Sequence, residues 1–397
     1  MADTLLRAFE SGELSHPMRG EANSVELFRA MALLSGVKLF KETPTTEKLC
    51  NVIGHHDHYL FVLVDGLGMN LKDRFPSGGF LESTLQHEIR SVFPSTTSVA
   101  LTSLATGLWP AEHGLTGWWT HFPEHRRVIA PLIFTERGTR TAADQLGLTV
   151  EDLIPTRPIL GSFFRDPRSF LPAHISEGRY AAWSRDGTPI DPFRSHGQLK
   201  RMIRRDAAAL RGPSYRYLYL LTVDKLCHKY GTASDQVTAD INRVDRLLTR
   251  IRDMLPHTVR MIVTADHGLV DVPPERHFSW RDEDPVCAHL LGGQSGEGTT
   301  PVFHVKPGHD ESFLEEFGRT EAAAHYTLHT PDELAKLDLY GPEPLSDAAR
   351  THLGQYIGIA VEPTRLEYLP PGSDPVNHVG VHGGLRPAEI NIPLCVA

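Results

Sequence analysis

Carboxylate and imidazole side chains follow three separate apolar segments of this chain. Asp65, Asp224 and the pair Asp266-His267 each come directly after an apolar run of six or seven residues, and His228 lies four residues beyond Asp224. Short apolar runs of this kind are typical of buried strands in a parallel sheet, and ligands bind beyond the carboxyl ends of such strands. Oxygen and imidazole ligands together suit zinc, with manganese as a second choice. The pattern therefore predicts a metal site at one edge of a sheet.

Each of these motifs taken alone also has a purely structural interpretation. Asp65 precedes a glycine, and such pairs are common in turns for conformational reasons. The spacing of Asp224 and His228 is one helical turn, which arises often by chance. Adjacent Asp266 and His267 are more specific, because both can reach one ion from the end of a strand. His382 stands in the pattern HxGxHGG at 378–384, where the glycines either let a ligand approach the backbone or form a simple turn.

The joint occurrence of these groups favours a centre with two ions. Two ions with three or four protein ligands each need about six to eight groups. The candidates are Asp65, Thr97, Asp224, His228, Asp266, His267 and His382. Three carboxylates and one threonine alkoxide carry four negative charges, which match two divalent cations and make the buried carboxylates tolerable.

Thr97 enters this group because it begins a predicted helix. Apolar residues recur at helical spacing over 97–106, and Gly107 follows as the expected C-terminal cap. Residues 95–97 then form the N-terminal turn, where free N–H groups and the helix dipole favour an anion. We expect the neighbouring Thr96 to cap this helix with its hydroxyl.

Several of these motifs resemble those of a known superfamily. The stretch FPSTTSVALTSLATGLWPAEHGLTG (93–117) resembles the nucleophile segment of the alkaline phosphatase superfamily, and most of all its nucleotide pyrophosphatase/phosphodiesterase branch. DxxxHxxG at 224–231, ADHG at 265–268 and HGG at 382–384 are similar to the remaining ligand motifs of that branch, in the same order. The resemblance extends in separated blocks from residue 60 to residue 394.

The resemblance implies a specific role for each candidate. Thr97 would be the nucleophile, selected over Thr96 by counting back from Thr106-Gly107 in the family pattern. One ion would be held by Asp65, Asp266 and His267 together with the Thr97 oxygen, and the other by Asp224, His228 and His382. The implied enzyme is a two-metal phosphodiesterase or nucleotide pyrophosphatase that acts through a phospho-threonine intermediate on a small, nucleotide-like phosphate ester. Zn²⁺ is the expected metal, and Mn²⁺ is the alternative.

The sequence departs from the family pattern just after the nucleophile. Residues 98–101 are Ser-Val-Ala-Leu, where the diesterase branch usually has Phe-Pro-Asn-His and uses the asparagine as a hydrogen-bond donor to the phosphoryl group. Phosphomonoesterase and phosphonate hydrolase activities of the same superfamily therefore stay open, as does an inactive metal-binding interaction protein. A sulfatase is disfavoured, because sulfatases need a modified Cys or Ser in place of Thr97. Trp118 and Trp119 either stack on a nucleobase or pack in the core.

The elements that must position these residues are those of an α/β protein. The segments 23–36 and 234–255 are amphipathic helices by their apolar spacing, and the passage from 217 to 265 predicts a right-handed strand–helix–strand unit. A further helix is expected at about 139–147. The resemblance implies an alkaline phosphatase-like three-layer sandwich, with a largely parallel central sheet between helices and an inserted cap.

Length and composition fit one such catalytic domain over 1–397. We expect its core at about 50–120, 200–272 and 376–397, and cap or insertions at about 121–199 and 273–375. The net charge of −9, from 40 basic and 49 acidic residues, disfavours a nucleic-acid polymer as partner. Neither the first 21 residues nor any later stretch reads as a secretion signal or a membrane span. Four scattered cysteines are expected to be free thiols, and the expected location is the cytoplasm. The sequence leaves the oligomeric state open.

Overall fold

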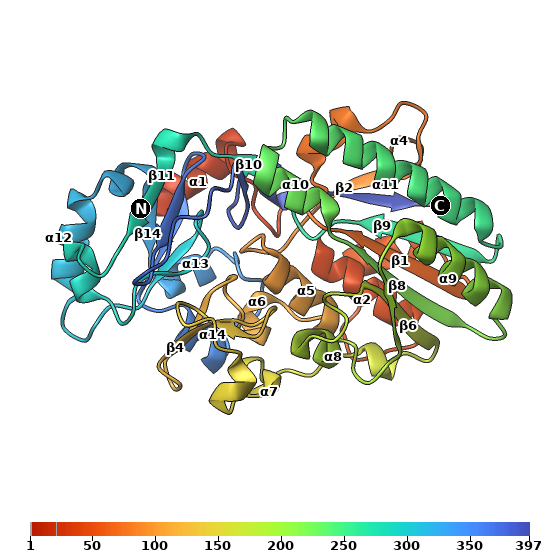
Figure 1. Ribbon diagram of the computed structural model, residues 1–397, viewed down its shortest axis with the longest axis horizontal. Helices are drawn as coiled ribbons and strands as arrows, with labels where there is room; N and C mark the ends of the chain where they lie inside the picture. The colour runs from red at the N-terminus through yellow and green to blue at the C-terminus, as the bar shows by residue number, and fades with distance from the viewer. Residues whose placement is uncertain (1, 21) are drawn as a thin grey trace.

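A central sheet of seven strands runs through the computed structural model, which describes residues 2–20 and 22–397. The strand order is β2-β18-β9-β1-β8-β6-β7 (Figure 1). All the strands run in one direction except β18, which pairs antiparallel with both β2 and β9. Their bounds are β1 His58–Val64, β2 Leu85–Arg90, β6 Asp166–Pro172, β7 Ile190–Phe193, β8 Ser214–Leu220, β9 Val259–Thr264 and β18 Asn391–Val396. The predicted largely parallel sheet is confirmed.

Helices cover the sheet on both faces, so the three-layer sandwich is also confirmed (Figure 1). One layer contains α9 (His196–Ala209), α10 (Thr222–Tyr230) and α11 (Asp235–Met254). The other contains α2 (Ser24–Leu34), α3 (Pro44–Ile53), α5 (Thr97–Thr106) and α8 (Arg179–Ser184). The helices expected at 23–36 and 234–255 correspond to α2 and α11. Their N-terminal caps are Asn23 and Ser234, whose side chains accept hydrogen bonds from main-chain N–H groups of the first turn.

The three strands that precede the candidate ligands are neighbours in the sheet. Val64 lies opposite Leu220, and Leu63 lies opposite Thr264, so β8, β1 and β9 end at the same edge. The strand expected at 217–223 is shifted, because β8 already ends at Leu220 and α10 begins at Thr222. Asp224 therefore lies in the first turn of a helix, where a carboxylate is favoured by the helix dipole.

The helix expected at about 139–147 is wrong. The structure has only a short 3₁₀ helix there, η2 (Ala143–Leu146). Arg140 has a positive φ of 56°, which is incompatible with a helix. Thr135 and Ala142 form an isolated bridge instead, so the segment folds back on itself.

Part of the segment 121–199, which the sequence suggested as cap or insertion, belongs to the main sheet. β6 pairs with β8, and β7 pairs with β6, both in parallel. Strand β6 was not predicted from the sequence, because Pro167 and Arg168 interrupt its apolar character. The remaining boundaries between core and insertions stay a prediction.

The segment 273–375 has a sheet and an apolar core of its own. Its four-stranded sheet has the order β12 (Ser295–Gly296), β13 (Pro301–Phe303), β15 (Tyr356–Ala360) and β14 (Tyr326–His329). Helix α12 (Asp310–Arg319) contributes Phe313 and Phe317, which pack against Trp280 and Phe303. In Figure 1 this part lies on the opposite side of the molecule from α9 and α11.

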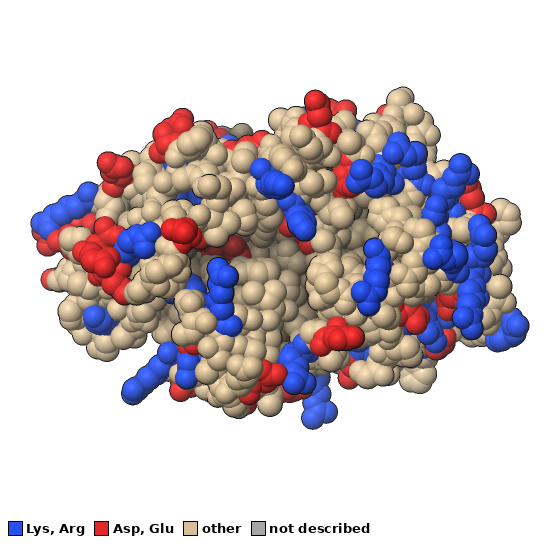
Figure 2. Space-filling model, viewed as in Figure 1, with Lys and Arg blue, Asp and Glu red and all other residues tan. Residues whose placement is uncertain are grey.

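The remaining elements are short, apart from α1. They are α1 Ala2–Ser11, η1 Met69–Arg74, α4 Phe80–Thr84, α6 Pro110–His113, β3 Thr120–Phe122, β4 Arg127–Ala130, β5 Thr135–Glu136, α7 Val150–Leu153, η3 Leu160–Ser162, β10 Val270–Asp271, η4 Pro274–Arg276, β11 His277–Trp280, η5 Pro285–His289, η6 Glu321–His325, α13 Pro331–Ala335, α14 Asp347–His352, β16 Arg365–Tyr368, β17 Gly380–Val381 and α15 Pro387–Ile390. None of the described helices combines the length and the apolar character that crossing a membrane requires. All four cysteines are free thiols, as predicted. Figure 2 shows a hollow near the middle of one face, with Lys and Arg side chains around it.

Candidate metal centre

Asp65 and Asp266 follow the neighbouring strands β1 and β9, and each has one oxygen held by hydrogen bonds. Asp65 Oδ2 accepts a short hydrogen bond from the Tyr219 hydroxyl. Asp266 Oδ1 accepts from the main-chain N–H groups of Gly66, at 3.1 Å, and of His267, at 3.0 Å. The other oxygens, Asp65 Oδ1 and Asp266 Oδ2, are buried and accept no hydrogen bond from the described residues. Both carboxylates are thus fixed with one oxygen left for a ligand.

The His267 ring lies between these carboxylates and Thr97. Its Nε2 atom is 3.0 Å from Thr97 Oγ1, 3.6 Å from Asp65 Oδ1 and 3.5 Å from Asp266 Oδ2. Its Nδ1 atom lies 3.1 Å from the Gly268 carbonyl and can donate to it. A proton on Nδ1 leaves the Nε2 lone pair facing the carboxylates, which is how a main-chain carbonyl orients a histidine for metal binding.

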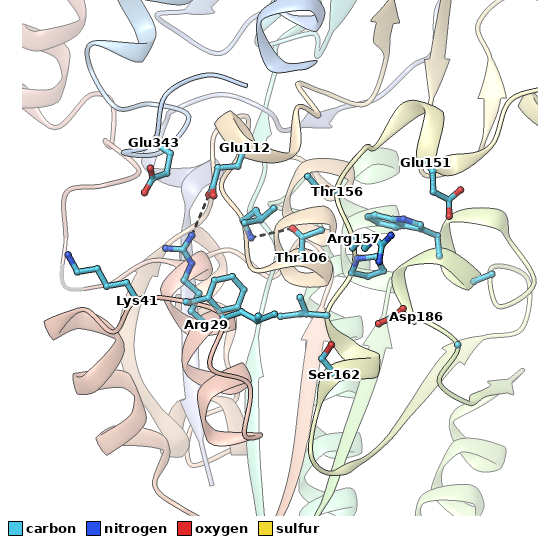
Figure 3. Close-up of a pocket in the computed structure, with 18 residues that line it drawn as sticks. Arg29, Lys41, Thr106, Glu112, Glu151, Thr156, Arg157, Ser162, Asp186 and Glu343 are labelled. Carbon is cyan, nitrogen blue, oxygen red and sulfur yellow. Dashed lines mark hydrogen bonds and ion pairs between the residues drawn. The ribbon is translucent and has the colours of Figure 1, made fainter. Parts of the chain in front are cut away.

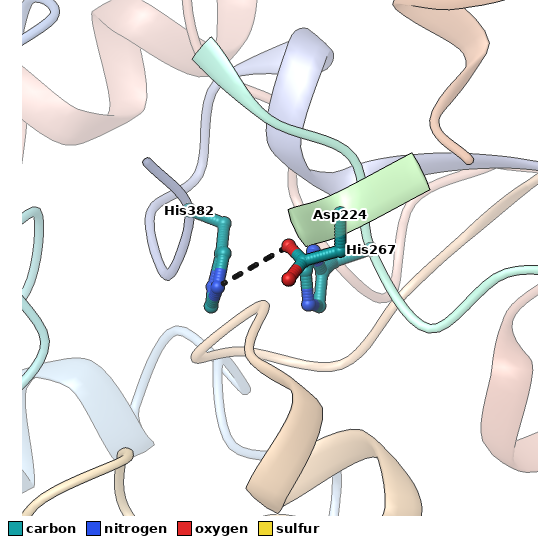
Figure 4. Close-up of side chains that lie close together, drawn as sticks. All are labelled: Asp224, His267 and His382. Carbon is teal, nitrogen blue, oxygen red and sulfur yellow. Dashed lines mark ion pairs between the residues drawn. The ribbon is translucent and has the colours of Figure 1, made fainter. Parts of the chain in front are cut away.

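A second group forms around Asp224 of α10. Asp224 Oδ1 lies 3.2 Å from His228 Nε2, on the same helix, and 3.9 Å from His382 Nε2 (Figure 4). His228 Nδ1 lies 2.8 Å from the Gly380 carbonyl, so its Nε2 is also left for a ligand. The rings of His267 and His382 stack at 3.9 Å, which brings the two groups together.

The electrostatics of this cluster favour a bound cation. Burial raises the pKa of Asp65 well above its usual value, and the nearby carboxylates of Asp266 and Asp224 raise it further. Burial also raises the pKa of Asp224, and it lowers the pKa of His382, with His267 adding to that decrease. Like-charged groups held together without a counter-charge are costly, and divalent cations remove that cost.

The ligand atoms themselves fit metal ions. One atom from each of Asp65, Asp266 and His267 lies within 4.8 Å of the others, and the same holds for Asp224, His267 and His382. The first triad is the one expected for one ion, whereas the second contains His267 where the sequence suggested His228, so His267 is close enough to belong to either group. His228 lies beside Asp224 rather than within the second triad. The structure brings all seven candidates to one place, and their division between two ions stays a prediction.

Thr97 is the first residue of α5, as predicted, and Gly107 ends the helix in the left-handed conformation at φ 69°. The first-turn N–H groups of Ser98 and Val99 have no main-chain acceptor in the described chain. Thr96 occupies the N-cap position, but its side chain makes no capping hydrogen bond with the described residues, so that part of the expectation is wrong. The free N–H groups next to Thr97 are suited to an anionic phosphoryl group.

Glu297 is a residue of this site that sequence reasoning missed. Its carboxylate accepts a hydrogen bond of 2.6 Å from the Trp118 main-chain N–H. Burial raises the pKa of Glu297 to about 7. It stands between Gly296 and Gly298 in a segment without clear periodicity, so the flanking glycines were its only local signal.

Thr97 lies in the wall of two cavities. The β8 cavity has a volume of about 380 Å³ and is lined by Tyr217 and Tyr219 of β8 and by Leu101 of α5. The β16 cavity has a volume of about 410 Å³ and is lined by Arg365 and Tyr368 of β16. Volumes of this size hold drug-sized ligands.

Three residues line both cavities, namely Thr97, Trp118 and Asp224. Trp119 lines the β16 cavity only. Both tryptophans are half-buried, so neither is a simple core residue. Their stacking on a substrate stays a prediction.

A further cavity, of about 1030 Å³, lies at the other end of α5 and contains none of the seven candidate ligands (Figure 3). Its charges largely compensate one another. Arg29, for example, pairs with Glu112 at 3.4 Å and donates to the Gly107 carbonyl. The chemistry-bearing residues are therefore concentrated at the N-terminal end of α5.

Comparisons with known proteins identify the family and the fold. A sequence profile of the family described as type I phosphodiesterase / nucleotide pyrophosphatase matches residues 59–350. The fold resembles murine ectonucleotide pyrophosphatase/phosphodiesterase 5 with a TM-score of 0.64 at 16% identity, over 85% of this chain and 87% of that chain. The human counterpart gives 0.63 at 17% identity with the same coverage. An inactive threonine-to-alanine variant of the murine protein, in complex with AMP, gives 0.65 at 16% identity, again over 85% and 87%. No protein of curated function matches the sequence.

Proposed function

Because the chain belongs to the type I phosphodiesterase/nucleotide pyrophosphatase family and is a hydrolase of phosphate esters, we propose that Thr97 is its nucleophile and that two divalent metal ions assist it. The preferred substrates are phosphodiesters or pyrophosphates of a nucleotide-like small molecule. The cytoplasmic location stays a prediction.

The arrangement of the two cavities carries the preference for diesters. A phosphodiester has a substituent on each side of the phosphorus, whereas a monoester has only one. Thr97 lines both the β8 and the β16 cavity, so a phosphorus atom placed there has a cavity available for each of two substituents. This supports a diesterase over the phosphomonoesterase alternative, although the asparagine of the diesterase branch is absent.

In the proposed reaction the Thr97 oxygen loses its proton and attacks the phosphorus, and the bond to the departing oxygen breaks. The phosphoryl group stays on Thr97 as a phosphothreonine that still carries the second substituent of the diester. Water then attacks the same phosphorus, releases the phosphate monoester and restores the Thr97 hydroxyl. The free N–H groups of Ser98 and Val99 can stabilise the negative charge that develops on the phosphoryl oxygens. These main-chain donors take the place of the missing asparagine side chain.

The residues proposed to hold the metals are the two ligand groups around His267. Asp65, Asp266 and His267 would hold one ion next to Thr97, and Asp224, His228 and His382 would hold the other. Divalent cations in such sites lower the pKa of a hydroxyl and neutralise charge on the attacking and leaving oxygens. Mixed carboxylate and imidazole ligands favour Zn²⁺, with Mn²⁺ as the alternative.

The aromatic side chains that line the cavities at Thr97 support a nucleotide-like substrate. Trp118 and Trp119 offer aromatic faces beside Thr97, and stacking on a base contributes about 1–3 kcal/mol. The murine relative in its inactive form is in complex with AMP. We propose the same class of ligand for this chain.

The decisive experiment replaces the nucleophile and its neighbour. Thr97→Ala should lower turnover of bis(p-nitrophenyl) phosphate by at least about a thousandfold, and acid quenching should trap a p-nitrophenyl phosphate group on Thr97 in the wild type only. Thr96→Ala is the matched control and should keep both signals. Turnover that survives Thr97→Ala would contradict the mechanism, and faster turnover of p-nitrophenyl phosphate than of the diester would favour a monoesterase.

A further inference from the structure

Arg185 is a buried cation in the wall of the β8 cavity. It follows α8 as the C-terminal cap residue and is only 5% exposed. The cavity that it lines also contains Thr97 and Asp65, so Arg185 faces the same space as the proposed nucleophile. The mechanism proposed above does not use it.

Among the described residues, no carboxylate pairs with this arginine. Its Nε atom donates to Ser184 Oγ at 3.3 Å, and its guanidinium lies over the Tyr217 ring at 4.4 Å. No ion pair joins it to a carboxylate of the described residues, and neither terminal nitrogen has a hydrogen-bond acceptor there. The terminal N–H groups of the Arg185 guanidinium are therefore available to a ligand in the β8 cavity.

Two other arginines show that this state is unusual within the same molecule. Arg165 lies over Tyr59 at 4.5 Å, and its terminal nitrogens donate to the carbonyls of Asp57 and Leu34. Arg137 lies over Tyr368 in the β16 cavity, and its terminal nitrogens also donate to main-chain carbonyls. Stacking on a tyrosine is thus accompanied by main-chain acceptors in both cases, but not at Arg185.

A buried guanidinium without a charged partner is costly, and arginine is almost never fully buried unless it is paired. Its planar fork matches the oxygens of phosphate or carboxylate groups. We propose that the β8 cavity contains an anion subsite at Arg185, which binds a second phosphate or carboxylate group of the substrate. The inference rests on the proposed function and narrows it to substrates with an anionic substituent on one side of the scissile phosphorus.

The spacing of residues along β8 indicates the distance between the reacting phosphoryl group and the second anion at Arg185. Arg185 lies over Tyr217, and Tyr219 donates to Asp65 from two residues further along β8. Alternate residues of a strand are about 7 Å apart. The second anion is therefore separated from the reacting phosphoryl group by a spacer rather than by a single atom. Lys225 of α10 lines the same cavity and adds positive charge.

The test measures binding of non-hydrolysable phosphonates to the metal-loaded protein by calorimetry. Alkane bisphosphonates are compared with alkylphosphonates of equal chain length, across a series of lengths. A second phosphonate that reaches Arg185 should tighten binding by about tenfold or more, with an optimum length. A parallel series of phosphonocarboxylates distinguishes a phosphate from a carboxylate as the second anion, and a gain with either series supports the subsite.

Arg185→Gln should abolish the gain and leave the affinity for alkylphosphonates unchanged, which also reports that the variant is folded. Arg165→Gln is the matched control and should keep the gain. Should Arg185→Gln fail to fold, Arg185→Lys decides: a smaller gain than in the wild type supports the subsite, and an unchanged gain overturns it.

A full gain in Arg185→Gln would overturn the inference. A gain lost in Arg137→Gln instead would also overturn it, because that result would locate the second anion in the β16 cavity. If alkylphosphonates bind but a second anion adds nothing at any length, the subsite fails and the proposed function stands. If no alkylphosphonate binds the metal-loaded wild type, the proposed function fails as well.

Discussion

The Tyr219 hydroxyl fixes one oxygen of Asp65 and thereby directs the other toward the proposed metal. Residues that orient a metal ligand typically contribute about 10–100-fold to metal affinity. We expect Tyr219→Phe to weaken zinc binding by that factor, measured by competition with a chelator. Tyr217→Phe, two residues earlier on the same strand, is the control and should bind zinc like the wild type. Equal affinities of both variants and the wild type would show that the hydrogen bond does not orient Asp65.

His113 makes the stability of the fold sensitive to acid. Its Nδ1 accepts from the Leu115 N–H at 3.2 Å and its Nε2 lies 3.1 Å from Ser103 Oγ, so the ring is neutral. Burial lowers the pKa of His113 from 6.5 to about 3. The neutral ring therefore stabilises the fold fully above pH 6.5, and that stabilisation is lost as the pH falls from 6.5 toward 3. The loss is about 1.4 kcal/mol for each pH unit inside that window.

His113→Asn keeps an acceptor near Nδ1 and does not titrate. Its free energy of unfolding should fall less steeply than that of the wild type between pH 6 and pH 4, in denaturant titrations at a series of pH values. The exposed His257→Asn serves as control and should keep the wild-type slope. Identical slopes in all three proteins would rule out His113 as a source of the acid sensitivity.

At the scale of single residues, the sequence predicted those metal-ligand candidates that stand in a recognisable local sequence pattern. Asp65 and Asp266 stand directly after apolar runs, and His382 stands in a glycine-rich motif. Tyr219 and Arg185 could not be identified in this way, because a tyrosine in a strand and an arginine after a helix are ordinary residues. Their roles depend on what the folded chain places opposite them.

Helix α5 depends on the glycine that ends it. Gly107 is left-handed, at φ 69°, and a Cβ atom there would lie 2.3 Å from the Phe40 ring. Gly147 has a similar φ of 79° and nothing within 4 Å of the added atom. Both alanine variants carry the cost of the left-handed backbone, about 1–2 kcal/mol, but only Gly107→Ala adds a clash.

We therefore expect Gly107→Ala to be less stable than Gly147→Ala by about 1–3 kcal/mol, the usual cost of overpacking. The measurement is the free energy of unfolding of both variants in denaturant. Equal losses would mean that Phe40 moves aside without cost.

At the scale of elements, periodicity predicted α2, α5 and α11, and continuous apolar runs predicted β1 and β9. The start of α10 was missed because the apolar run of β8 continues without a break into that helix, where Val223 is also buried. Strand β6 was missed because its neighbours in the sheet, rather than its own composition, make it a strand. Both errors arise where tertiary contacts override the local pattern.

For the molecule as a whole, metal removal should reduce stability. Without cations, Asp65, Asp224 and Asp266 are held close together, and each has one oxygen that accepts no hydrogen bond from the described part of the chain. A ligand that binds only the folded state adds about 2.7 kcal/mol at a hundredfold excess over its Kd. We expect zinc to raise the melting temperature of the chelated protein by several degrees. Asp65→Asn should show a smaller increase, and an absence of any shift in the wild type would contradict the metal centre.

The position of strand β18 implies that the central sheet is completed late in synthesis of the chain. It is inserted between β2 and β9 and is the last strand along the sequence. On a translating ribosome, β2 has no partner in the main sheet until residues 391–396 have emerged. His382 also emerges late, long after Thr97. The nascent polypeptide therefore cannot complete the catalytic centre early, so an unfinished or truncated product should be hydrolytically silent rather than weakly active.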